Sequence, residues 1–184
     1  MKQIGLAVVM YAQAYDERMV PSRSELVVVG IRNSPTLLYP YVMNHQVFLC
    51  PSQSGIYQHY SPGNTIRFWS NVSPNCRVLP DFVRSNPAFK LTDIKYPAET
   101  LVYADVDWTG DKADGNNNSW QVPYAYGPTN FIPARHNGGA NLAFADGHAK
   151  WHAMQLANLP QVGPTPRTLY PEDVCWYPSG APKY

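Results

Sequence analysis

A histidine and an aspartate at a defined spacing are the first residues in this chain that could carry out chemistry. Nine residues separate His136 from Asp146, which Gly147 follows directly. A histidine oriented by a carboxylate can act as a general base, and the same pair would suit a metal-dependent hydrolase. However, no serine or cysteine stands in a nucleophile motif, and neither a phosphate-binding loop nor a His-Glu-x-x-His zinc motif occurs. Aspartate is also favoured in turns for backbone reasons. We therefore predict a structural role for this pair and no enzymatic activity.

An acidic stretch is the second candidate site, because oxygen ligands at short spacing are what Ca²⁺ binds. The spacing does not match an EF-hand, so a solvated polar loop over residues 107–119 is the alternative interpretation. The predicted ligands of a structural calcium ion are Asp105, Asp107, Asp111 and Asp114. The histidines are too scattered to predict a zinc site; they are His45, His59, His136, His148 and His152.

Three cysteines leave one without a partner if the protein is exported and two of them pair. A Cys50–Cys76 disulfide closes the shortest loop and is the favoured pairing. A bond to Cys175 instead would attach the C-terminal tail. Exposed aromatic residues such as Trp108 and Trp120 indicate a further alternative, a surface module that binds glycans.

The composition bears on location and partners. Charged residues make up 15% of the chain, against about 25% in an average protein, so uncharged polar groups, Tyr and Pro must form much of the surface. This balance favours an extracellular location. The net charge is +1 and no basic stripe is visible, which argues against nucleic acid as a partner. The length suits one domain.

The chain opens with a predicted helix over residues 2–15. Its apolar residues follow the helical period, but Leu6, Val9 and Met10 make the opposite face apolar as well. No residue at its start can cap the helix. These features indicate a helix that is buried on more than one side. It is either a core helix near the edge of the fold or the continuation of a longer helix upstream of Met1.

Strand signals dominate the rest of the predicted fold. Residues 140–145 and 148–152 predict a hairpin with Asp146-Gly147 as a two-residue turn, in which both residues need positive φ. Residues 100–105 predict another strand, and residues 47–52 a short buried strand that ends in a turn. Turns are predicted at residues 62–64 and 73–75, and residues 26–31 fit either a strand or the start of a helix. Residues 37–43 are apolar but interrupted by Pro40. The class that follows is α+β.

Three segments, in order, resemble one bacterial family. Residues 136–147 match its His-x9-Asp-Gly signature, Met1–Asp16 resemble its helix just after the membrane-spanning half, and residues 41–52 resemble its segment ending in Phe-x-Cys-Pro-Ser. The family is the pilin-like group of prepilin-type processing-associated proteins, which is similar to type IV pilins and the pseudopilins of type II secretion.

The resemblance implies a prepilin leader, a half-helix in the inner membrane before assembly, and a head in which the N-terminal helix packs on an antiparallel sheet with long Pro-rich loops. Residues 1–20 would then be the C-terminal half of the pilin helix, 21–159 the head, and 160–184 an irregular tail packed on the head or a neighbour. Several pseudopilins of this kind hold a structural Ca²⁺ in a loop of the sheet. The residues expected to mediate assembly are Ile4, Ala7, Val8, Tyr11 and Tyr15.

The function implied is that of a structural subunit. Copies of the chain, or the chain and other pilins, would assemble into an extracellular filament or a secretion pseudopilus. The open alternatives are the glycan-binding module and the hydrolase at His136 and Asp146.

Overall fold

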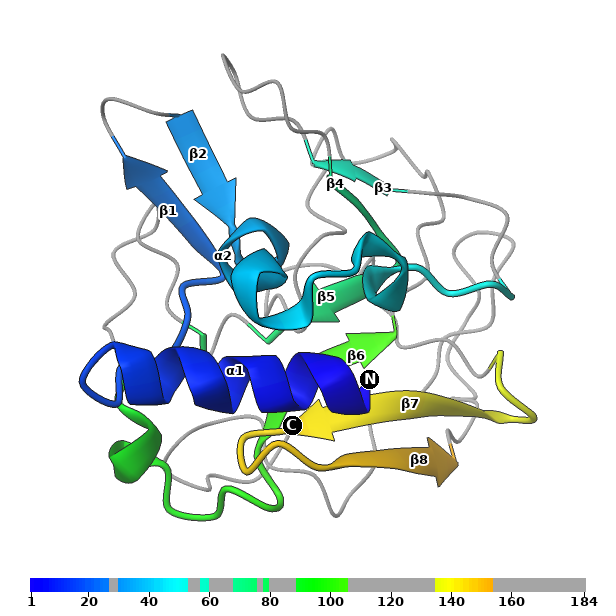
Figure 1. Ribbon diagram of the computed structural model, residues 1–184. Coiled ribbons are helices and arrows are strands. Elements are labelled where there is room, and N and C mark those ends of the chain that lie inside the picture. The colour runs from blue at the N-terminus through cyan, green and yellow to red at the C-terminus, as the bar shows by residue number, and fades with distance from the viewer. Residues whose placement is uncertain are drawn as a thin grey trace, which may run out of the picture.

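Helix α1 (Lys2–Ala14) lies across one face of a four-stranded antiparallel sheet in the computed structural model (Figure 1). The structure describes residues 1–26, 30–52, 57–59, 68–75, 78–79, 89–105 and 135–153. The strand order of the sheet is β5 (Val72–Pro74), β6 (Leu101–Asp105), β7 (Gly139–Phe144) and β8 (Ala149–Ala153). The predicted α+β class is confirmed at this level. The predicted tail, residues 160–184, lies outside the described residues.

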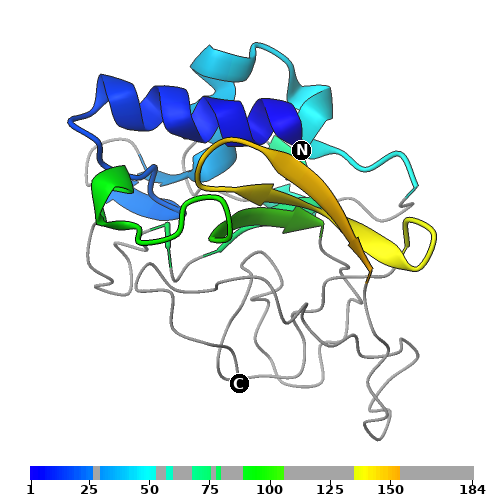
Figure 2. The ribbon, with the colours of Figure 1, turned by 90° about the horizontal axis from the view of Figure 1, so that it is seen from below.

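Smaller elements surround this sheet. Helix α2 (Ser34–Val42) packs against α1, and Figure 2 shows both helices in one layer on the same side of the sheet. Two antiparallel hairpins and two short 3-10 helices complete the described fold. They are β1 (Arg23–Leu26) with β2 (Gly30–Asn33), β3 (Tyr57–His59) with β4 (Phe68–Ser70), η1 (His45–Phe48) and η3 (Leu91–Asp93).

Helix α1 matches the sequence prediction to within one residue, and no side chain caps its start. Ile4, Ala7 and Val8 are fully buried in the core that the helix forms with α2, β6 and β7. Leu6 and Met10 point away from this core and remain 45% and 48% exposed. Within the described part of the chain, neither helix is long and apolar enough to cross a membrane.

The contact between α1 and the β7–β8 turn is made by two glycines. A Cβ atom on Gly5 would lie 2.8 Å from the backbone oxygen of Gly147, which is closer than real carbon atoms approach. Gly147 has a φ of 89° and packs under Leu6 and Val9 of the helix. The helix and the turn can therefore meet backbone to backbone because Gly5 lacks a side chain, while the positive φ of Gly147 favours glycine in the turn.

The β7–β8 hairpin is present as predicted, but its turn is longer. Phe144 and His148 close the loop through a bond from the Phe144 N–H to the His148 oxygen (2.9 Å), so three residues connect the strands. Among these, Gly147 has positive φ and Asp146 does not. The prediction of a two-residue turn was wrong because Ala145 leaves the ladder and donates to the Thr100 oxygen instead. A three-residue loop with glycine in the left-handed conformation is the next most common hairpin turn.

Residues 73–75 were predicted as a turn, and the structure corrects this. Val72–Pro74 forms β5, an edge strand paired with β6. Proline is tolerated there because an edge strand does not need every N–H group for pairing. Asn75 then donates from its backbone to Val102 (2.8 Å) and from its side chain to Leu101 (2.9 Å). These bonds satisfy carbonyl groups of β6 where its register to β7 shifts.

Residues 47–52 do not form the predicted strand. Asn44 caps the 3-10 helix η1 by accepting the Gln46 N–H at 2.9 Å, and this local bond competes with extended structure. The turn predicted at Pro51 is present. Within residues 26–31, Leu26 ends β1 and Gly30 and Ile31 begin β2, whereas residues 27–29 lie outside the described residues. Helix α2 continues through Pro40 to Val42. The turn predicted at residues 62–64 lies outside the described residues.

The buried tyrosine Tyr103 links the sheet to α2. Its hydroxyl group forms a hydrogen bond with the Ser34 hydroxyl, and both residues are fully buried. Burial raises the pKa of Tyr103 well above its usual value near 10, and the Ser34 hydrogen bond offsets only part of this effect. The neutral phenol is therefore strongly preferred in the folded protein.

We expect Gly5→Ala to destabilise the protein by about 1–3 kcal/mol, because the new methyl group must separate α1 from the β7–β8 turn. Urea denaturation measures the change in the free energy of unfolding. Gln13→Ala on the exposed side of the same helix is the control and should change stability by less than about 0.5 kcal/mol. Equal effects of the two substitutions would contradict the backbone contact.

The raised pKa of Tyr103 predicts a loss of stability in alkali. Below about pH 10 the phenol is neutral in both states, and above it only the unfolded chain releases the proton. The free energy of unfolding should then fall by up to about 1.4 kcal/mol per pH unit more steeply than in Tyr103→Phe. Denaturation curves of both proteins from pH 9 to 11 measure these slopes. Identical slopes would show that Tyr103 ionises normally.

Candidate functional site

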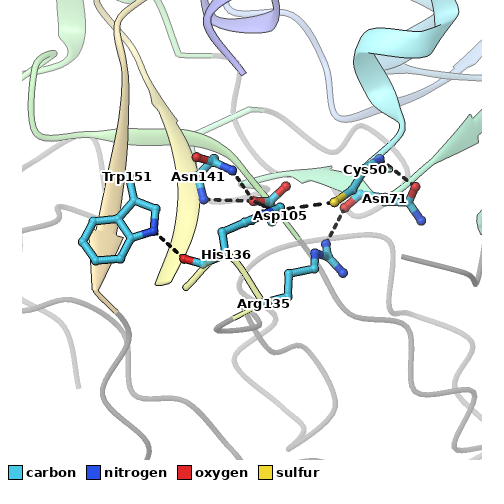
Figure 3. Close-up of polar contacts among 7 residues, drawn as sticks. All are labelled: Cys50, Asn71, Asp105, Arg135, His136, Asn141 and Trp151. Atoms are coloured by element: carbon cyan, nitrogen blue, oxygen red, sulfur yellow. Dashed lines mark hydrogen bonds and ion pairs between the residues drawn. The ribbon is translucent and has the colours of Figure 1, made fainter. Parts of the chain in front are cut away.

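Three side chains from distant parts of the chain meet where β6 ends and β7 begins. The Nε2 atom of His136 lies 3.5 Å from the Sγ atom of Cys50 and 3.1 Å from the Oδ2 atom of Asp105. All three potential ligand atoms lie within 4.8 Å of one another. Figure 3 shows the three side chains pointing toward a common point. We call these three residues the Cys–Asp–His cluster.

The segment that carries Cys50 is tied by two hydrogen bonds to Asn71, the residue before β5. Its backbone N–H donates to the Oδ1 atom of Asn71 (2.9 Å), and the Asn71 N–H donates to the Phe48 oxygen (2.8 Å). The chain leaves η1 in an extended conformation at Leu49, which carries Cys50 to this position. The thiol is buried, so its place is determined by packing as well as by hydrogen bonds.

Asp105 is the last residue of β6 and is almost completely buried. Its Oδ2 atom accepts two bonds from Asn141 of β7, from the backbone N–H at 2.9 Å and from the side-chain amide at 3.2 Å. A buried carboxylate needs such donors, because an unpaired charge in the interior is costly. Asn141 therefore fixes the direction in which Asp105 faces His136.

His136 precedes β7 in a tight turn that its glycines make possible. His136 and Gly139 exchange two backbone hydrogen bonds, and between them Asn137 and Gly138 have φ values of 53° and 78°. This is the two-residue geometry with two positive φ angles that favours Asn-Gly. The two positive φ angles expected at Asp146-Gly147 therefore occur at Asn137-Gly138 instead.

Trp151 of β8 anchors the same turn from the other side. Its indole N–H donates to the backbone oxygen of His136 at 2.7 Å (Figure 3). The ring occupies the space where a Cβ atom of Gly139 would stand. The position of the His136 backbone is thus set by β8, and the position of its ring by Cys50 and Asp105.

The contacts of His136 distinguish between two kinds of chemistry. In a nucleophile–histidine–carboxylate relay, the nucleophile and the carboxylate contact opposite nitrogens of the ring. Here Cys50 and Asp105 both contact Nε2. The arrangement therefore does not fit a relay, whereas convergence of sulfur, oxygen and nitrogen on one point is the arrangement that can hold a metal ion.

The predicted His136–Asp146 pair does not form, since the two residues lie at opposite ends of β7. Asp146 instead contacts the Nδ1 atom of His148 at 2.6 Å, in an exposed pair at the β7–β8 turn, and it also accepts the His148 N–H at 3.0 Å. The carboxylate beside His136 is Asp105. A hydrolase built on His136 and Asp146 has no support in this geometry.

Most other predicted site residues lie outside the described residues. These are the calcium candidates Asp107, Asp111 and Asp114, the cysteines Cys76 and Cys175, and the aromatic residues Trp108 and Trp120. Asp105, the remaining calcium candidate, faces His136 and Cys50 instead. Cys50 is a free cysteine in the structure, and the Cys50–Cys76 disulfide stays a prediction because Cys76 lies outside the described residues.

The described histidines do not gather into one site. His45 stacks on Tyr39, His148 stacks on Phe144, and His152 is buried near the same phenylalanine. The sequence did not predict Cys50 as a partner of His136, or Asn141 as the donor to Asp105. The sequence did hold one signal for the proximity of Asp105 to His136. The end of one strand lies beside the start of its antiparallel neighbour, and Asp105 ends a predicted strand while His136 precedes another.

A second candidate surface is the outer face of α1, by which we mean Gln3, Leu6, Met10 and Gln13. These residues are exposed, and no charged residue occurs between Lys2 and Asp16. Of the five residues predicted to mediate assembly, Ile4, Ala7 and Val8 are buried in the chain's own core. Tyr11 is half-buried and stacks on Tyr15, which is exposed.

The chain has no match among the protein-family models, curated proteins and solved structures with which it was compared. Its function must therefore be inferred from its own residues. Two features bear on it: the Cys–Asp–His cluster and the outer face of α1.

Removing the aspartate from each of the two His–Asp pairs that flank β7 should have different effects on the free energy of unfolding. Asp105→Ala should cost about 1–3 kcal/mol, because it leaves the two part-buried donors of Asn141 without their acceptor. Asp146→Ala removes an exposed pair and a turn bond and should cost no more than about 1 kcal/mol. Chemical denaturation of both variants measures the difference. A smaller loss for Asp105→Ala than for Asp146→Ala would contradict the assigned contacts.

Proposed function

We propose that this chain is a pilin-like structural subunit of an extracellular filament or secretion pseudopilus, and that it acts by assembling with copies of itself rather than by catalysis. The observation that carries the proposal is the uncharged outer face of α1. A helix on the surface of a monomer normally turns charged and polar residues to water. This one presents Leu6 and Met10, each nearly half exposed, between two glutamines.

The occupant that suits this face is the same face, or another surface, of a second copy. This face consists of apolar side chains bordered by neutral amides, so a partner surface needs no charged residues to complement it. Contacts between two different surfaces of identical subunits do not close and so generate open filaments. Assembly of that kind requires the helix to be presented outward, and the contacts of α1 with the sheet and with α2 leave its outer face exposed.

The segments that carry the family resemblance also contact one another. The helix of residues 1–16 touches the Asp-Gly turn through Gly5 and Gly147. The segment of residues 41–52 contributes Cys50, which contacts His136. The resembling motifs thus form a continuous structural unit, which supports the interpretation of the signature as architectural and not catalytic.

Charge introduced on the outer face of α1 tests the proposal. We expect Leu6→Glu combined with Met10→Glu to abolish assembly, because two carboxylates would have to be buried at each contact. Circular dichroism checks that the variant is folded, since Leu6 also covers Gly147. Electron microscopy of material from cells that express the complete gene measures assembly. Met43→Glu, at a residue that is 71% exposed after α2, is the matched control and should assemble normally.

Two results would contradict the proposal. One is that the unmodified protein from such cells consists of discrete monomers. The other is that the double glutamate variant forms the same filaments in the same amount as the control.

A further inference from the structure

We propose that Cys50, Asp105 and His136 bind a divalent transition-metal ion of the zinc type, through Sγ, a carboxylate oxygen and Nε2. This site is distinct from the outer face of α1 and does not depend on assembly. The proposal rests on the distances between the three ligand atoms, on the protons that they would otherwise have to share, and on the residues that hold them in place.

Two of the three distances between the ligand atoms are close to those of a tetrahedral centre. With zinc bond lengths near 2.3 Å to sulfur and near 2.1 Å to nitrogen or oxygen, tetrahedral angles place S and N about 3.6 Å apart and N and O about 3.4 Å apart. The structure has 3.5 Å from Cys50 Sγ to His136 Nε2 and 3.1 Å from His136 Nε2 to Asp105 Oδ2. The sulfur and the carboxylate oxygen lie within 4.8 Å of each other, so all three ligand atoms surround one point.

Hydrogen bonds alone cannot satisfy Cys50 Sγ, Asp105 Oδ2 and His136 Nε2 at the same time. A neutral imidazole nitrogen either donates or accepts, so Nε2 can satisfy the carboxylate as a donor or the thiol as an acceptor, but not both. A metal ion removes the conflict because all three atoms then offer lone pairs to one centre. Binding releases the thiol proton, and the charges of a thiolate, a carboxylate and a divalent cation sum to zero.

The surrounding residues already hold the ligands in place. Asn141 donates twice to Asp105, Asn71 accepts the N–H of Cys50, and Trp151 binds the carbonyl oxygen of His136 (Figure 3). Outer-shell contacts of this kind orient the ligands of metal centres and strengthen binding. The combination of thiolate, imidazole and carboxylate favours zinc over calcium, which takes oxygen ligands alone.

The access route lies on the histidine side. The side chain of His136 is 22% exposed, whereas that of Asp105 is 5% exposed. Three protein ligands leave the fourth position of a tetrahedral ion to water or to a group from outside. The ion would therefore join β6, the turn before β7, and the segment after η1 at a point that solvent reaches.

Cobalt provides a direct test, because a thiolate bound to Co²⁺ gives an intense charge-transfer absorption. The full chain, kept reduced, is titrated with Co²⁺ and then with Zn²⁺. We expect one equivalent of Co²⁺ to produce this band and Zn²⁺ to remove it. Zinc should also raise the melting temperature, since a ligand of the native state stabilises it by mass action.

Substitutions assign the band to the site. Cys50→Ser should abolish the charge-transfer band. Loss of an outer-shell partner weakens metal binding by roughly 10–100-fold, and His136→Gln, which removes a ligand, should weaken it by more. Circular dichroism confirms that each variant is folded, and the partly exposed His136 serves if the buried Cys50 variant does not fold. Two controls should keep the band: the double variant Cys76→Ser/Cys175→Ser, and His148→Gln, which alters the exposed His–Asp pair.

The proposal is overturned by any of three results. These are absence of the band in the folded, reduced protein, persistence of the band in Cys50→Ser, and loss of the band in the Cys76→Ser/Cys175→Ser control, which would locate the metal elsewhere.

Discussion

The contact between Gly5 of α1 and Gly147 of the β7–β8 turn sets the arrangement of the described fold. It brings two backbones together at a point where a side chain on Gly5 would hold them apart. Because this contact fixes the rotation of the helix about its own axis, Ile4 and Val8 must enter the core and Leu6 and Met10 must face outward. The exposed apolar strip is therefore a consequence of how the helix is seated. A shift of the helix by one residue would bury a different set.

Strand β7 has a histidine–carboxylate pair at each end, and the environments of the two pairs differ. At the turn, Asp146 and His148 are partly exposed to water, and the Asp146 carboxylate also accepts the backbone N–H of His148. At the other end, Asp105 is buried, receives two donors from Asn141, and shares His136 with a thiol. The same two residue types thus support a turn in one place and form a convergent cluster in the other. Burial and the third partner make the difference.

Local signals were sufficient for the elements that local interactions determine. The helix at residues 2–15, the strand ending at Asp105 and the hairpin around Asp146-Gly147 all follow from periodicity and turn chemistry. The errors arose where a neighbour distant in the sequence decided the outcome. Ala145 leaves the ladder because Thr100 accepts its N–H, and residues 72–74 extend because β6 pairs with them. Cys50 and His136 lie 86 positions apart, and no spacing rule links a cysteine after a 3-10 helix to a histidine before a strand.

The pairing of Asp105 with His136 has a topological consequence. One residue ends β6 and the other stands three positions before β7, so together they close the base of the connection formed by residues 106–134. The entropy of closing a loop grows only with the logarithm of its length. The Asp105–His136 contact adds a side-chain link to the backbone pairing of β6 with β7. Because loop-closure entropy depends so weakly on length, the cost of forming this link would change little with the number of residues between the two ends.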